Sequence, residues 1–114
     1  MLLQSGTLKL GSASALGSGS GQFRTTLGAA VLDLNGQSVA SENALIEAAT
    51  TITNSSATAA SWGGAIGISG ANLTFSTAAG DIAVGGAISG GGVIKMGSGT
   101  LAVSGDNSGL TSAW

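Results

Sequence analysis

The sequence predicts an all-β protein, a parallel β-helix (β-solenoid) of about five rungs, each built from three short strands joined by turns. Two observations support this fold. Small residues dominate the composition, because 68 of the 114 residues are Gly, Ala, Ser or Thr, and the 26 Leu, Ile, Val and Phe are scattered. The larger apolar residues also recur with a period near 21 residues. A round core needs clusters of large side chains, whereas a thin core repeated along an axis does not.

Short alternating segments bounded by Gly, Ser or Asn indicate where the strands lie. The expected strands cover residues 7–10, 31–34, 50–53, 65–68, 73–75, 82–84, 93–96 and 101–103. Turn-forming pairs such as Asn35–Gly36 and the run Gly90–Gly92 separate them. The segment Val39–Thr50 fits a helix, and a strand with a turn explains it equally well.

Three interleaved columns of apolar residues carry the period, and each is expected to stack one strand above its equivalent. The columns are Leu8, Leu32, Ile52, Leu73 and Ile94; Ile46, Ile66, Ile88 and Leu110; and Val39, Ala59, Ile82 and Leu101. The first column is expected to point inward throughout. A direct echo supports the repeat, since Ser5–Leu8 (SGTL) recurs as Ser98–Leu101.

Composition excludes several classes of function. The chain has no Cys, His or Pro, so it offers neither a disulfide framework nor the commonest general base and zinc ligand. Three basic residues and a net charge of −2 do not suit nucleic acid. No apolar run is long enough for a membrane-spanning helix, and Met1–Gln4 does not resemble the start of a signal peptide.

The segment Gly90–Gly109 resembles the autotransporter-associated β-strand repeat. Along this segment a glycine-rich turn is followed by an apolar residue before Lys95 and then by the sequence Gly-x-Gly-Thr-Leu. An alternating strand and the element Ser-Gly-x-Asn come next. Ser5–Gly11 followed by Ala15–Gly19 resembles a further part of that repeat, and Val31–Gln37 resembles its next strand. The family's aromatic residue after the Ser-Gly-x-Asn element is missing here, where the chain reads Ser108-Gly109-Leu110.

The resemblance implies a right-handed parallel β-helix that belongs to the passenger region of a bacterial autotransporter. Residues 1–114 would then be a single β-helical segment, a fragment of a longer passenger rod exported through the outer membrane by a C-terminal β-barrel. The expected location is the bacterial cell surface or the extracellular space. The expected function is structural, a stalk with a possible adhesive face, and its partners are neighbouring repeats of the same polypeptide and a surface ligand that could include glycans.

Two other functions stay open. A carbohydrate-binding or carbohydrate-processing β-helix would show clustered carboxylates and aromatic residues. A self-associating filament subunit would join end to end, because Leu2–Leu10 and Thr100–Ser104 are read as strands near the two ends with little chain to cover them.

No residue is expected to be catalytic, to bind a cofactor or to bind a metal. Asp33, Asp81 and Asp106 lie in or beside strands, so they could share a face, but turn capping explains them as well. Asp81 after Gly80 resembles part of a calcium-binding repeat that needs tandem copies. Trp62 is the one candidate ligand surface, as an aromatic platform for a sugar, and packing over the Gly63–Gly64 turn is its structural alternative.

Overall fold

The computed structural model describes residues 2–16, 22–25, 28, 30–40, 42–106 and 108–110, and these residues form strands and turns with no helix. The strands are β1 (Leu2–Leu3), β2 (Gly6–Lys9), β3 (Gln22–Thr25), β4 (Ala30–Asp33), β5 (Ser38–Val39), β6 (Asn43–Ile46), β7 (Thr50–Thr53), β8 (Ala60–Trp62), β9 (Ile66–Ser76), β10 (Ile82–Val84), β11 (Ile88–Met96), β12 (Leu101–Val103) and β13 (Gly109–Leu110). All strand pairs are parallel.

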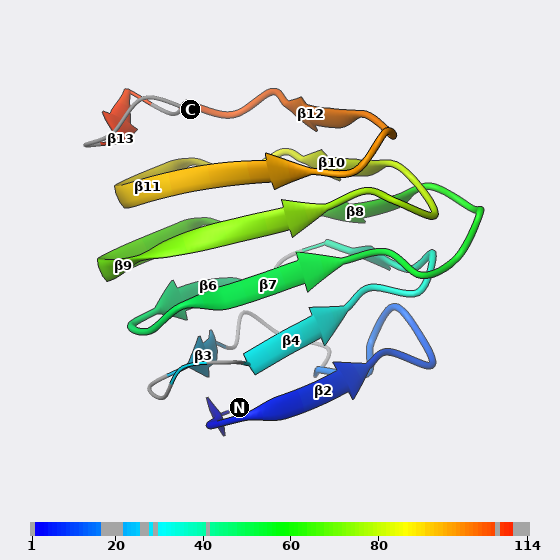
Figure 1. The fold of residues 1–114 in the computed structure, drawn as a ribbon, viewed down its shortest axis with the longest axis horizontal. Helices are drawn as coiled ribbons and strands as arrows, with labels where there is room; N and C mark the ends of the chain where they lie inside the picture. The colour runs from blue at the N-terminus through cyan, green and yellow to red at the C-terminus, as the bar shows by residue number, and fades with distance from the viewer. Residues whose placement is uncertain are drawn as a thin grey trace.

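The strands stack into a β-solenoid with three faces (Figure 1). The first face holds β1, β3, β6, the first halves of β9 and β11, and β13. The second face holds β2, β4, β7 and the second halves of β9 and β11, and the third holds β5, β8, β10 and β12. In Figure 1 the chain rises from the N-terminal rung, crosses the near face from left to right and returns behind, so the solenoid is right-handed.

Rung 1 contains β1 and β2, rung 2 contains β3 to β5, rung 3 contains β6 to β8, rung 4 contains β9 and β10, and rung 5 contains β11 and β12. Rungs 2 to 5 are complete, rung 1 contributes two described faces, and β13 lies above rung 5 on the first face. The expected parallel β-helix of about five rungs is therefore confirmed. All eight expected segments lie in strands, although 65–68 and 73–75 are parts of the single strand β9, and Val39–Thr50 holds strand and turn instead of a helix.

The three apolar columns lie on three different faces, as expected, although some partners differ. Ile66 pairs with Ile88, and Ile82 pairs with Leu101, as the period predicted. Ile46 instead pairs with Ile68, and Leu110 with Gly90. On the third face Ala60, which is buried, takes the inward place expected for the exposed Ala59.

The first column points inward up to rung 4 and fails in rung 5. Leu32, Ile52 and Leu73 are fully buried and Leu8 packs partly against the core, but Ile94 is 44% exposed. Val93, not Ile94, pairs with Leu73. The register between β9 and β11 shifts at Gly90–Gly92, so the rung is one residue shorter here than the period assumed. In a strand, one residue moves a side chain to the other face.

Glycine columns let the rungs approach at the corner between the third and first faces. A Cβ on Gly64 would lie 1.8 Å from the backbone oxygen of Glu42, and a Cβ on Gly86 would lie 2.0 Å from that of Gly64. Gly64 and Gly86, which the sequence marks as turn residues, are thus also required for stacking. The repeated Ser-Gly-Thr-Leu sequence does not mark equivalent positions of two rungs. Thr7–Leu8 lies on the second face, whereas Leu101 lies on the third.

Candidate functional site

The expected ligand surface at Trp62 lies inside the core. The indole is 0% exposed and packs edge-on against Phe23 of β3, with ring centroids 6.3 Å apart and planes 67° apart. Val39 and Val84 pair with Trp62 from the rungs below and above. The ring therefore offers no face to a sugar, and it packs in the core against Phe23 instead of over the Gly63–Gly64 turn. The sequence shows that two glycines follow Trp62, but it does not show the direction of the side chain. Only the stacking of the rungs determines that the indole is directed inward.

The three strand-associated carboxylates cap turns. Asp33 Oδ1 accepts hydrogen bonds from the backbone N–H groups of Asn35 and Ser55, each at 3.0 Å. Asp81 Oδ1 accepts one from the N–H of Thr100 at 2.9 Å. Asp106 Oδ1 accepts one from the N–H of Ser108, also at 2.9 Å. Asp33 therefore joins the turn of rung 2 to Ser55 of rung 3, and Asp81, just before β10 in rung 4, joins that rung to Thr100 of rung 5.

Two opposing effects set the pKa of Asp33. Burial raises it, and hydrogen bonds from Ser55 and Asn35, with the charge of Lys9, lower it by more, so the pKa lies below its ordinary value of 3.8. The carboxylate is thus the stable form of this turn cap. The pKa of the exposed Asp106 is also lowered, by its hydrogen bonds with Ser108.

The two glutamates have opposite environments. Glu47 is half-buried and accepts a hydrogen bond from Arg24 Nε, a contact whose hydrogen bond and charge raise the pKa of Arg24. Glu42 is 3% exposed, and neither carboxyl oxygen has a hydrogen-bond partner in the described part of the chain. Glu42 lies immediately before β6, beneath Gly64. Sequence reasoning gave no sign of this burial, because it depends on the corner where the rungs stack.

The proposed part of a calcium repeat is occupied by turn structure. Gly80 is buried because its backbone packs on rung 3, where a Cβ would lie 2.1 Å from the oxygen of Ser56. Asp81 Oδ1 accepts its hydrogen bond from Thr100 of rung 5. No group of three or more His, Cys, Asp or Glu that could hold a metal ion occurs among the described residues.

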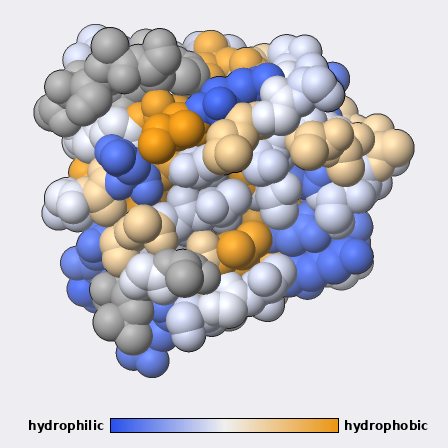
Figure 2. Space-filling model, in the orientation of Figure 1, coloured by the Kyte–Doolittle hydropathy of each residue, from blue (hydrophilic) through white to orange (hydrophobic). Residues whose placement is uncertain are grey.

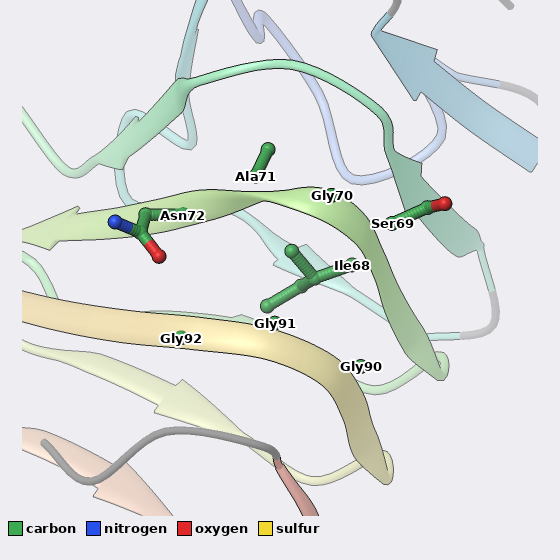
Figure 3. A pocket seen from close by; sticks show the side chains of 8 residues that line it. All are labelled: Ile68, Ser69, Gly70, Ala71, Asn72, Gly90, Gly91 and Gly92. Carbon is green, nitrogen blue, oxygen red and sulfur yellow. The ribbon is translucent and has the colours of Figure 1, made fainter.

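A shallow groove of about 550 Å³ lies at the corner between the first and second faces of rungs 4 and 5. It is lined by Ile68, Ser69, Gly70, Ala71, Asn72, Gly90, Gly91 and Gly92. Figure 3 shows the side chains of Ile68 and Asn72 directed from β9 towards the glycines of β11, whereas Ser69 and Ala71 point away.

Unequal corner lengths create this groove. Four residues separate Ile68 from its next inward neighbour Leu73, whereas two separate the paired positions Gly90 and Val93. The corner of rung 4 therefore projects beyond that of rung 5. Its polar side chains, Ser69 and Asn72, are neutral, so the groove can form hydrogen bonds but its lining holds no acid or base. In the sequence, the Gly90–Gly92 run is the feature that marks this corner, and such a run is equally typical of an ordinary turn.

The groove glycines have a structural explanation. A Cβ on Gly90 would lie 1.8 Å from the oxygen of Ile68, and one on Gly91 would lie 2.2 Å from that of Ala71. Close rung stacking thus requires both glycines, with or without a ligand.

Comparison of the chain with protein-family models, with curated proteins and with solved structures finds no match. None of the described segments is a helix of the length and apolar character that would cross a membrane.

Proposed function

We propose that this chain is a structural segment of a longer β-solenoid rod, in the passenger region of a bacterial surface-displayed or secreted autotransporter. The repeat-like residues Gly90–Gly109 support the family, and the stacked parallel rungs support the rod. Successive rungs of one polypeptide already pair edge to edge, so further rungs would continue the same ladder.

The observation that carries the proposal is that strands at both ends of the solenoid have one unpaired edge. Within the described residues, β2 pairs only with β4, β5 only with β8, and β12 only with β10. Among residues whose burial the structure describes, the exposed large hydrophobic side chains are Leu2 (50%), Ile94 (44%) and Met96 (58%), all in rung 1 or rung 5. Unpaired strand edges beside apolar side chains favour the addition of another strand.

The outer surface agrees with a structural role. Outward positions on the third face are Ser or Ala in successive rungs, namely Ser38, Ser61, Ala83 and Ala102. Figure 2, viewed on the second face, shows mostly residues of intermediate hydropathy with separate hydrophobic and hydrophilic patches. The neutral groove and the buried Trp62 give less support to carbohydrate processing than a cleft with aromatic and carboxylate side chains would.

The experiment compares this chain with a version extended by the residues encoded on either side of it. Extension should raise the melting temperature and reduce association measured by sedimentation velocity at increasing concentration. Met96→Lys, beside the open edge, should also reduce association, whereas Ala83→Lys on the exposed middle of rung 4 should not. A monodisperse monomer with no stability gain on extension would contradict the proposal.

The same open edges favour a second candidate, a subunit that associates end to end. A head-to-tail contact between stacked rungs generates an open filament instead of a closed ring. Filaments that persist after the chain is extended would support this candidate over the rod segment.

A further inference from the structure

Asn35 and Gly36 form a tight turn between the second and third faces of rung 2. Both have positive φ angles, 49° and 72°, and the N–H of Gln37 donates a hydrogen bond to the oxygen of Leu34 at 2.9 Å. Positive φ at both central residues is the geometry for which Asn-Gly is preferred. The turn therefore explains why this dipeptide stands here.

Neighbouring rungs hold this turn from both sides. Asn35 Nδ2 donates to the oxygen of Leu10 in rung 1 at 3.0 Å. The N–H of Gly36 donates to Asn54 Oδ1 in rung 3 at 2.9 Å. Asn54 is itself 0% exposed and also donates to the backbone oxygens of Thr58 and Asp81. The side-chain amide of Asn35 and the backbone nitrogen of Gly36 are thus each bound to a different rung.

Asn-Gly is also the dipeptide in which asparagine is chemically most labile, because glycine does not hinder ring closure. The backbone nitrogen of Gly36 loses its proton to water and attacks Cγ of Asn35. The new N–C bond forms as the Cγ–Nδ2 bond breaks, and the leaving nitrogen departs as ammonia. Water then opens the succinimide ring at either carbonyl and leaves aspartate or isoaspartate. No oxidant or reductant is needed.

The native contacts oppose this reaction at both reacting groups. The attacking nitrogen has its N–H directed to Asn54, and the amide that must turn towards it is held on Leu10. We propose that Asn35 is a conformationally gated deamidation site, closed while rungs 1 to 3 are stacked and reactive once rung 1 or rung 3 separates from the turn.

Reaction at this site would prevent the rungs from restacking correctly. The product loses the Nδ2 donor and places a carboxylate opposite the backbone oxygen of Leu10, near the carboxylate of Asp33, which caps the same turn. An unpaired acceptor opposite an acceptor is destabilising. Isoaspartate would add a backbone carbon to a two-residue turn. The modification would therefore record that the N-terminal rungs had opened.

The test incubates the full chain at neutral pH, with and without denaturing urea, and follows residue 35 by peptide mass spectrometry and enzymatic isoaspartate detection. Deamidation should be about tenfold to a hundredfold slower in the folded chain, the factor that two hydrogen bonds provide. Asn35→Gly is the matched control, because glycine accepts the positive φ and has no amide to lose. Equal rates in the two conditions would overturn the gating.

A second variant tests the consequence of the reaction. Removal of Asn54 would disturb its bonds to Thr58 and Asp81, so Asn35→Asp is used as the reaction product itself. Its urea midpoint should fall relative to the parent chain and to Asn35→Gly. An unchanged midpoint for Asn35→Asp would overturn the claim that deamidation weakens the contact between rungs 1 and 2.

Discussion

Replacing the buried Glu42 with methionine should stabilise the protein. Both carboxyl oxygens are buried without a hydrogen-bond partner in the described part of the chain, at a corner where Gly64 from the next rung contributes no side chain. A buried polar group left unsatisfied costs about 1–3 kcal/mol. Methionine has a similar length and a flexible chain that fills irregular core space. Glu42→Met should therefore raise the free energy of unfolding by about 1–3 kcal/mol.

Urea denaturation followed by circular dichroism measures this change, provided that the slope of the transition stays constant. Glu47→Met is the matched control, because Glu47 is only half-buried and is paired with Arg24. Ion pairs at the surface contribute little to stability, so this control should lose a little stability or none. A lower midpoint for Glu42→Met than for the parent chain would refute the reasoning, since it would show that the carboxyl group has a stabilising partner.

Leu73→Ala should lower the free energy of unfolding by about 2–5 kcal/mol, because Leu73 is fully buried. Ile94→Ala at an outward position should cost less than about 1 kcal/mol in the same denaturation assay, and equal losses would contradict the register. Gly86→Ala should lower the melting temperature strongly, because the new Cβ would lie 2.0 Å from the backbone oxygen of Gly64. Gly85→Ala should leave the melting temperature close to that of the parent chain, because its Cβ would meet only Ser104 Oγ, at 4.0 Å. The stabilisation from Asp33 should be complete above its ordinary pKa of 3.8 and be lost as pH falls through its lowered pKa in the folded protein. Asp33→Asn should flatten this acid limb in melts recorded across pH, and identical profiles for the two chains would argue against the turn cap.

Sequence alone determined the architecture because its signals are local or periodic. Alternation with a period of two marks the strands, and glycine or asparagine marks many turns, so all eight expected segments lie in strands, two of them in β9. The spacing near 21 residues located the three faces. The absence of proline and the few charges agree with a ladder of parallel strands at ordinary spacing.

The tertiary structure alone decided register and burial. The corner after Gly90 is two residues shorter than the corner after Ile68, so Val93 follows Leu73 by 20 residues and is buried, whereas Ile94 is exposed. Which rung lies above a given turn determines that Trp62 packs on Phe23, that Glu42 is enclosed, and that Asn54 reaches Gly36. The contacts of Trp62 with Phe23 and of Asn54 with Gly36 join residues 39 and 18 positions apart in sequence, so no local pattern encodes them. They depend on the length of every corner between them, and the stacked chain fixes those lengths together.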